Sequence, residues 1–294
     1  MLREHAALIA DIERDWAAAG LSGSLLARNL DTGAELGFGA GIAWPLASVI
    51  KLPLAVVVHD AFERGELDPA EPFELDPDRA TSGPTGVSLF RHPSRVAAED
   101  LMQLALAVSD NAATDALLER IGIETVTERL AGFGFAEIVL RHPMRAIYGM
   151  SGAVAEVGLG LAAGATTPGG GHLIGELDPH RANVGTARAL LDLLDRLWTD
   201  RISTPAACAR LRAALGHQLT RHRLAVELAS DEVRVLSKTG TFLDLRHEAG
   251  VVEAGPDRVA VVALTRSSIP ASVQLEAEFA IGHAGRLAVD ALRG

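Results

Sequence analysis

A serine and a lysine three positions apart stand at the start of an apolar stretch with helical spacing. These residues are Ser48 and Lys51. In a helix this separation places both side chains on one face, so the amine lies beside the hydroxyl. A hydroxyl is a weak nucleophile at neutral pH, and a desolvated lysine can accept its proton. The pair predicts a nucleophilic serine with a lysine base, although a solvated helix face gives the same pattern.

Two further short motifs carry polar side chains of the same kind. Ser109-Asp110-Asn111 lies in a helical region, where these residue types often cap a helix. Lys238-Thr239-Gly240 ends a predicted strand, where a turn with an exposed charge is the ordinary interpretation. Each motif alone is common. Together and in this order, S-x-x-K, S-D-N and K-T-G resemble the signature of class A β-lactamases and penicillin-binding proteins.

The resemblance extends over nearly the whole chain and is strongest to class A enzymes. It includes, in order, SVIKLPLAVVV, VSDNAATDALLERIG, HRLAVEL, and SKTGT followed by RHEAGVV. Members of this family combine an α/β sheet domain with a helical domain. The resemblance therefore implies an active site in the cleft between two such domains.

The resemblance also implies catalytic roles for four residues. Ser48 would attack a carbonyl, and Lys51 would accept or relay its proton. Ser109 would pass the proton to the leaving nitrogen. Lys238 would hold Ser109 and a substrate carboxylate by its charge. These four residues are the expected catalytic set.

Four other positions are expected to bind substrate. Asn111 would contact the substrate amide, and Thr239 would hydrogen-bond the carboxylate. The backbone N–H groups of Ser48 and Thr241 would form an oxyanion hole, which stabilises charge as it develops in the transition state. Arg246 resembles a carboxylate-binding position, although a charged residue on a solvent-facing strand is an equal alternative.

The resemblance breaks in the loop that carries the deacylating glutamate of class A enzymes. When Glu176-Leu177-Asp178 is aligned with the family's E-L-N, the base position falls on Ile174, which cannot take a proton. An apparent insertion also spans residues 148–172. Glu156 and Glu176 are the alternative bases, although most glutamates are solvated surface charges. We therefore expect slow hydrolysis of an acyl-enzyme.

The elements that must position these residues divide the chain into two units. Residues 1–44 and 217–294 contain a terminal helix at each end and strands that read as one antiparallel sheet. Residues 45–216 are dominated by helical spacing. The expected fold is α/β (α+β) with two lobes: an antiparallel sheet flanked by terminal helices, and an all-helical lobe.

Composition excludes several classes of protein. The 294 residues are 48% hydrophobic and 22% charged, typical of a globular protein, and the net charge of −11 disfavours nucleic acid. A lone Cys208 permits no intrachain disulfide, and no spacing indicates a metal or cofactor. Residues 149–165 are too short to span a membrane and are expected to form a helix. The N-terminus predicts an amphipathic helix without a secretion signal, so a cytoplasmic location is expected if Met1 is the native start.

Three functions follow from these observations. The first is a class A type hydrolase that opens a β-lactam or related amide through an acyl-Ser48 intermediate. The second is a DD-peptidase or esterase on the same scaffold. The third is a penicillin-binding sensor that keeps its acyl group. The expected partner is a small substrate with a carboxylate, and the sequence leaves the oligomeric state open.

Overall fold

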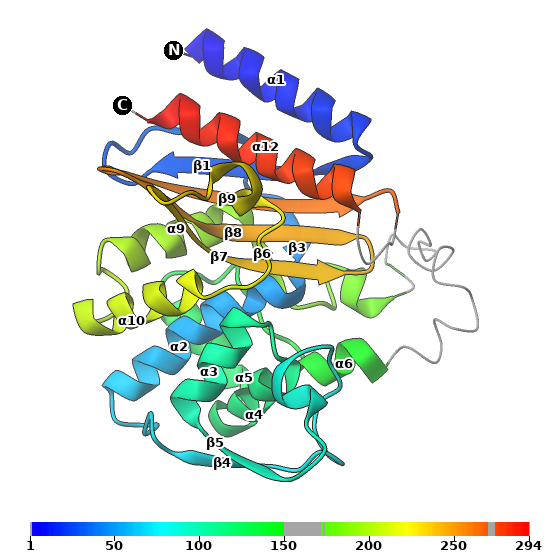
Figure 1. Ribbon diagram of the computed structural model, residues 1–294, viewed down its shortest axis with the longest axis vertical. Coiled ribbons are helices and arrows are strands. Elements are labelled where there is room, and N and C mark those ends of the chain that lie inside the picture. The colour runs from blue at the N-terminus through cyan, green and yellow to red at the C-terminus, as the bar shows by residue number, and fades with distance from the viewer. Residues whose placement is uncertain (1, 150–171, 173, 270–273, 294) are drawn as a thin grey trace.

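An antiparallel sheet built from both ends of the chain organises the fold (Figure 1). The structure is a computed structural model that describes residues 2–149, 172, 174–269 and 274–293. Within this part, the main sheet has the strand order β2-β1-β9-β8-β7. Its strands are β1 (Leu21–Asn29), β2 (Glu35–Phe38), β7 (Val233–Phe242), β8 (Leu245–Ala254) and β9 (Asp257–Ser267).

The register joins the N-terminal hairpin to the C-terminal strands. β1 pairs along its whole length with β9, from Leu21 opposite Ser267 to Asn29 opposite Val259. β7 and β8 pair from Val233 opposite Ala254 to Phe242 opposite Leu245. The K-T-G motif therefore lies on an edge strand of the sheet.

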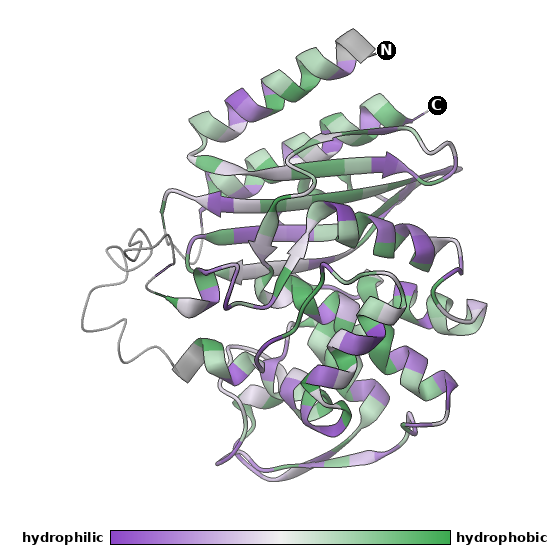
Figure 2. Cartoon of the chain, turned by 180° about the vertical axis from the view of Figure 1, so that it is seen from behind, coloured by the Kyte–Doolittle hydropathy of each residue, from purple (hydrophilic) through white to green (hydrophobic). Residues whose placement is uncertain are grey.

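Two terminal helices cover one face of the sheet. These are α1 (Leu2–Ala18) and α12 (Leu275–Leu292), which lie side by side in Figure 1. Their apolar sides join the sheet in one core that contains Trp16, Val261 and Ile281. The two helices alternate green and purple in Figure 2, as expected for elements with one buried side.

The opposite face of the sheet packs on the middle of the chain. This part of the chain contains three 3₁₀ turns: η1 (Ala47–Ile50), η2 (Gly86–Leu89) and η3 (Gly175–Leu177). The helices on this side are α2 (Lys51–Glu63), α3 (Ala98–Ala107), α4 (Asn111–Ile121), α5 (Ile123–Gly132), α6 (Met144–Gly149), α9 (Ala187–Trp198) and α10 (Pro205–Gly216). The short helix α11 (Leu224–Leu228) packs instead against α12, in the core of the terminal helices. Helix α2 is almost wholly buried and runs through the second, larger core.

The expected fold class is confirmed, with local differences. The helical pattern across residues 97–122 predicts continuous helix, but the chain breaks between α3 and α4 at Ser109, whose φ is 58°. Two small hairpin-like pairs were not expected: β3 (Ala43–Pro45) with β6 (Val184–Thr186), and β4 (Pro72–Leu75) with β5 (Ser94–Ala97). Segments of three or four residues are too short to show a period of two.

Two sequence expectations fall in or near the undescribed segment. The helix expected over 149–165 lies outside the described residues except for Gly149. Among the helices that are described, none has the length and apolar character needed to cross a bilayer. The boundaries 1–44, 45–216 and 217–294 stay a prediction.

A buried cluster of charges links α12 to the strands that carry the K-T-G motif. The Glu278 carboxylate accepts a hydrogen bond from Nη2 of Arg223 at 3.2 Å. It also forms an ion pair with Nε of Arg246 at 3.3 Å. All three side chains are at most 1% exposed. Arg223 also donates to the carbonyls of Gly240 (3.1 Å) and His247 (2.6 Å). One carboxylate thus pairs with two guanidinium groups inside the fold.

Replacing Glu278 with alanine is expected to destabilise the protein by about 3–5 kcal/mol, because it leaves buried cations without a counter-charge. Urea unfolding measures the effect. Glu276→Ala, at an exposed position in the first turn of the same helix, is the matched control and is expected to change stability by less than about 0.5 kcal/mol. Equal stability of the two variants would contradict the role of the cluster.

Candidate active site

Ser48 and Lys51 share one tight turn. Ser48 lies in the 3₁₀ turn η1, and Lys51, the first residue of α2, donates its backbone N–H to the carbonyls of Ser48 and Val49. Side chains three apart nearly eclipse in a 3₁₀ turn, so this turn stacks the lysine over the serine more closely than an α-helix would. Ala47, directly before the serine, has a φ of 45°. A non-glycine residue at positive φ is strained by about 1–3 kcal/mol, and such strain gathers at functional sites.

The amine of Lys51 is fully buried and is surrounded by the S-D-N motif. Its Nζ lies 2.6 Å from the carbonyl oxygen of Ser109, 2.8 Å from Oδ1 of Asn111 and 3.2 Å from Oγ of Ser109. A neutral amine has two N–H donors, which match the two shorter contacts. Its lone pair is then left for a hydroxyl proton. The structure therefore brings Lys51, Ser109 and Asn111 together as the sequence predicts.

Asp110 fixes this loop from behind. Its carboxylate accepts from the N–H groups of Ala112 and Ala113 as the N-cap of α4, and also from the N–H of Val87 and the hydroxyl of Ser88. Both interpretations of the S-D-N motif are therefore compatible. The aspartate caps the helix, while its two neighbours face the lysine.

Lys238 enters the site from strand β7. Its side chain is fully buried and donates to the carbonyl oxygen of Thr239 at 2.8 Å. Next to it, Gly240 lies against the turn that carries Ser48. A Cβ at Gly240 would stand 2.9 Å from both the carbonyl oxygen of Leu46 and the nitrogen of Val49. The glycine of K-T-G is needed because the strand and the serine turn meet without room for a side chain.

The two threonines of this strand differ in their surroundings. Thr239 is buried, and both its N–H (2.6 Å) and its hydroxyl (3.0 Å) bond to Oε1 of Gln218. Gln218 in turn donates to Ser237, which donates to the buried carboxylate of Glu248. Thr241 is exposed at the end of the strand, and its hydroxyl accepts from Nη2 of Arg223 at 2.7 Å.

The carboxylate-binding role of Arg246 stays a prediction, and the structure places this residue opposite Thr241 in the sheet. It is fully buried and donates to the carbonyls of Leu243 (2.6 Å) and Leu245 (2.9 Å), besides its pairing with Glu278. The alternative of a solvent-facing strand residue is wrong. Arg223, which the sequence analysis did not single out, is the guanidinium that contacts Gly240 and Thr241. Arg223 belongs to the HRLAVEL stretch that carries part of the family resemblance, and this stretch could have pointed to it.

The electrostatics of the site centre on two amines. Burial, followed by repulsion from Lys238, holds the pKa of Lys51 well below its ordinary value, against the opposing pull of Asp110 and Asp115. The pKa of Lys238 is lowered to about 7. Burial is the main cause, Glu248 opposes the shift by its negative charge, and Arg223 adds to it by its positive charge. These are the only two lysines in the chain. Apart from the 10 histidines, all other basic residues are arginines, which cannot deprotonate in a protein.

The loop before β6 carries an apolar residue at the expected base position. Ile174 is 1% exposed and packs with Ala47, Leu177 and Leu245 in a small apolar cluster. Glu176 lies on η3 of the same loop. Glu156 lies outside the described residues. An isoleucine therefore borders the serine turn where the family's water-activating carboxylate is expected.

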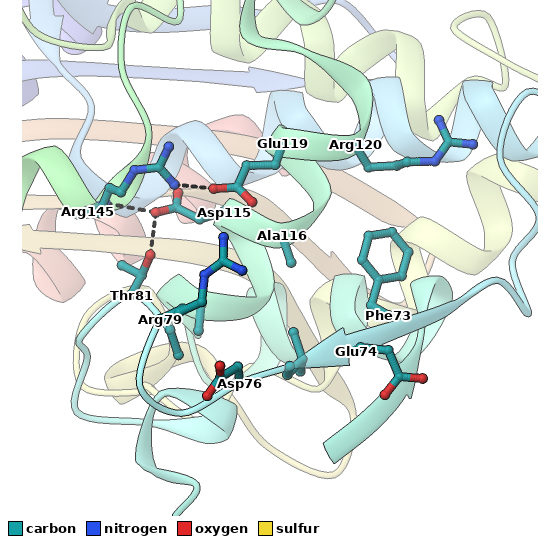
Figure 3. A pocket seen from close by; sticks show the side chains of 13 residues that line it. Phe73, Glu74, Asp76, Arg79, Thr81, Asp115, Ala116, Glu119, Arg120 and Arg145 are labelled. Carbon is teal, nitrogen blue, oxygen red and sulfur yellow. Dashed lines mark hydrogen bonds and ion pairs between the residues drawn. The ribbon is translucent and has the colours of Figure 1, made fainter. Parts of the chain in front are cut away.

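A surface cavity with room for a ligand lies away from these groups. It has a volume of about 440 Å³ and lies between the β4 hairpin, α4 and α6 (Figure 3). Asp115 at its edge accepts from the hydroxyl of Thr81 and from the N–H groups of Met144 and Arg145. Neither Ser48 nor either lysine lines it. The predicted catalytic residues therefore lie outside this cavity.

Comparison with known proteins agrees with the geometry. The family model of the β-lactamase enzyme family matches residues 6–292. This chain belongs to the β-lactamase enzyme family. Among curated relatives, the β-lactamase regulatory protein BlaB of Streptomyces cacaoi is 44% identical over 292 residues, covering 93% of this chain and 94% of the relative.

Solved structures of the family share the fold at low sequence identity. PBP-A is 20% identical with a TM-score of 0.78, covering 97% of this chain and 95% of its own. A β-lactamase from Sphaerobacter thermophilus is 21% identical with a TM-score of 0.77, covering 98% and 96%. A mutant of PBP-A, also 20% identical with a TM-score of 0.78 over 97% and 96%, was captured as an acyl-enzyme complex with penicillin G. At this identity the neighbours establish the fold of the serine hydrolases of this family.

The described residues also bear on metal chemistry. Within them, no group of three or more His, Cys, Asp or Glu side chains is placed to hold a metal ion.

The pKa of Lys238 predicts a pH dependence for substrates that carry a carboxylate. Lys238 is a cation below pH 7 and loses its charge as the pH rises through about 7, so its attraction for the carboxylate is lost at higher pH. We expect the acylation rate constant for a penicillin, divided by that for a neutral ester, to fall between pH 6 and pH 9. The ratio removes the titration of Lys51, which both substrates share. A ratio that stays constant or rises over this range would contradict the assignment.

Proposed function

We propose that this chain is a penicillin-binding serine hydrolase in which Ser48 forms a long-lived acyl-enzyme with a β-lactam or a related amide. The observation that carries the proposal is the fully buried Lys51 amine, which is held by Ser109 and Asn111 one turn from Ser48. Burial favours its neutral form, which can take the proton of the serine hydroxyl.

The acylation step uses groups that the cleft already contains. Lys51 removes the proton from Ser48 as its oxygen attacks the carbonyl carbon of the amide. The C–N bond then breaks, and Ser109 delivers a proton to the leaving nitrogen while Lys51 resupplies Ser109. The products of this step are an ester on Ser48 and, for a lactam, an amine that stays attached. Lys238 attracts the substrate carboxylate by its charge, and Arg223 positions the exposed Thr241 beside it. The hydroxyl of Thr239, which the sequence analysis assigned to the carboxylate, instead donates to Gln218.

Two observations favour a long-lived acyl-enzyme over fast turnover. Ile174 places buried hydrocarbon where a general base is expected, and general bases typically accelerate a step by about 10²–10⁴-fold. The relative that is 44% identical is a β-lactamase regulatory protein. A signal that reports a bound β-lactam needs an adduct that persists. Fast β-lactamase turnover and DD-peptidase or esterase activity are the alternatives.

Time-resolved intact-mass spectrometry with penicillin G tests the proposal. We expect wild-type protein to gain one penicillin per chain within the mixing time and to lose it over many minutes, with little steady nitrocefin hydrolysis. Ser48→Ala is expected to gain no mass at all, because the ester oxygen is absent.

The matched control is a conservative change at an exposed serine, for example Ser230→Ala, which should leave the adduct unchanged. Rapid nitrocefin turnover without an accumulating adduct would instead establish a working β-lactamase. Reaction only with small esters or D-alanyl peptides would establish the alternative hydrolase activities.

A further inference from the structure

The cavity between strand β4 and helix α4 is lined by both hydrocarbon and charge (Figure 3). Its volume of about 440 Å³ suits a small organic molecule, since ligand pockets typically measure about 300–1,000 Å³. Phe73, Leu75 and Ala116 supply part of the hydrocarbon, and four carboxylates and three guanidinium groups supply the charge. A ligand for this cavity therefore needs charged groups as well as an apolar part.

Five of these seven charged side chains already have partners within the protein. Asp115 is buried and accepts from the hydroxyl of Thr81 and from two backbone N–H groups at the start of α6. The other four form ion pairs, which are Arg145 with Glu119, Arg120 with Glu71, and Glu74 with Arg95. These partners satisfy the five groups without a ligand.

The remaining two charges, Asp76 and Arg79, form no ion pair in the part of the chain that the structure describes. They lie on the turn after β4, where the backbone N–H of Arg79 donates to the carbonyl of Asp76 at 3.1 Å. Only Oδ1 of Asp76 is in use, since it accepts from the N–H of Asp78 at 3.0 Å. The side chain of Arg79 points toward α4 in Figure 3. One cation and one anion of the lining are thus left for a ligand.

The apolar part of the lining comes from both walls of the cavity. Phe73 and Leu75 lie on one face of β4, because side chains two apart in a strand point the same way. Ala112 and Ala116 are four apart on α4 and therefore share one face of the helix. Their small side chains leave space over the β4 residues for the hydrocarbon of a ligand.

We propose that this cavity is a second binding site, for a small zwitterion with an apolar side chain, such as a short peptide. The ligand carboxylate binds the guanidinium of Arg79, whose planar fork matches two carboxylate oxygens. The ligand ammonium group binds the free oxygen of Asp76, and the hydrocarbon packs on Phe73 and Leu75. A simple anion is a poorer match, because the lining has four carboxylates against three guanidinium groups. The inference does not rest on the acyl-enzyme chemistry, since the serine nucleophile and both lysines lie outside the cavity.

Titration of the full chain with four dipeptides, Ala-Phe, Phe-Ala, Ala-Leu and Leu-Ala, tests the proposal. Nitrogen-15 labelling makes the Nε–Hε signals of the arginines visible, and the signal of Arg79 is assigned by its absence from Arg79→Gln. We expect this signal to shift on binding, with half-saturation on the order of 1 mM for at least one dipeptide.

Blocking one charge of the dipeptide at a time assigns the two contacts. The C-terminal amide lacks the carboxylate and the N-acetyl form lacks the ammonium group, so each is expected to bind about tenfold more weakly. In Arg79→Gln the dipeptide and its amide should bind alike. In Asp76→Asn the dipeptide and its N-acetyl form should bind alike, and asparagine keeps the oxygen that accepts from the N–H of Asp78.

The matched control is Arg91→Gln, a change at an exposed arginine outside the lining, which should bind the dipeptides as wild type does. Equal urea midpoints show that the variants keep the fold. No saturable binding of any of the four dipeptides up to about 10 mM would overturn the proposal. Binding that is unchanged in Arg79→Gln would also overturn it, because the dipeptide would then lie elsewhere. Neither result bears on the acyl-enzyme, and a failure of penicillin G to react would leave this site unaffected.

Discussion

The side chains of Lys51 and Lys238 are both fully buried, and the surrounding structure is arranged to keep them there. Each is removed from water, and the charge of Lys238 opposes the charge of Lys51. Burial disfavours an ammonium ion far more than a neutral amine, so both amines of the site release a proton more readily than an exposed lysine does. Arginine cannot do this. Apart from its histidines, the chain uses arginine at every other basic position and lysine only at these two, which agrees with a chemical requirement at both.

The frame around the amines is fixed by contacts that tolerate little change. Gly240 brings the edge strand against the serine turn, and Ser109 adopts a left-handed conformation that turns its hydroxyl and carbonyl toward Lys51. Behind the strand, Gln218 and Glu248 satisfy its buried polar groups. The charge cluster at Glu278 ties the same strand to the last helix. Two segments almost two hundred residues apart in sequence thereby meet at one site.

Much of this arrangement could be predicted from the sequence, because the three motifs specify residue type and spacing together. The sheet from both chain ends and the long helices also carry clear periodicity. Arg246 could not be placed, because β8 is buried on both faces and shows no alternation that would tell one side from the other. The break at Ser109 was hidden because α3 and α4 continue one helical pattern across it. Glu176 and His142 line the same small cavity because two loops meet in the fold. No local sequence pattern encodes this meeting.

The account predicts that at least one of the two lysine amines is neutral at physiological pH. Carbon-13 labelling of lysine tests this directly, because the chain gives only two side-chain Cε signals and Lys238→Arg leaves only that of Lys51. We expect Lys238 to titrate at a pKa of about 7 and Lys51 well below the ordinary value of 10.5. Titration of both amines near 10.5 would contradict the account, because neither could then take the proton of Ser48 at neutral pH.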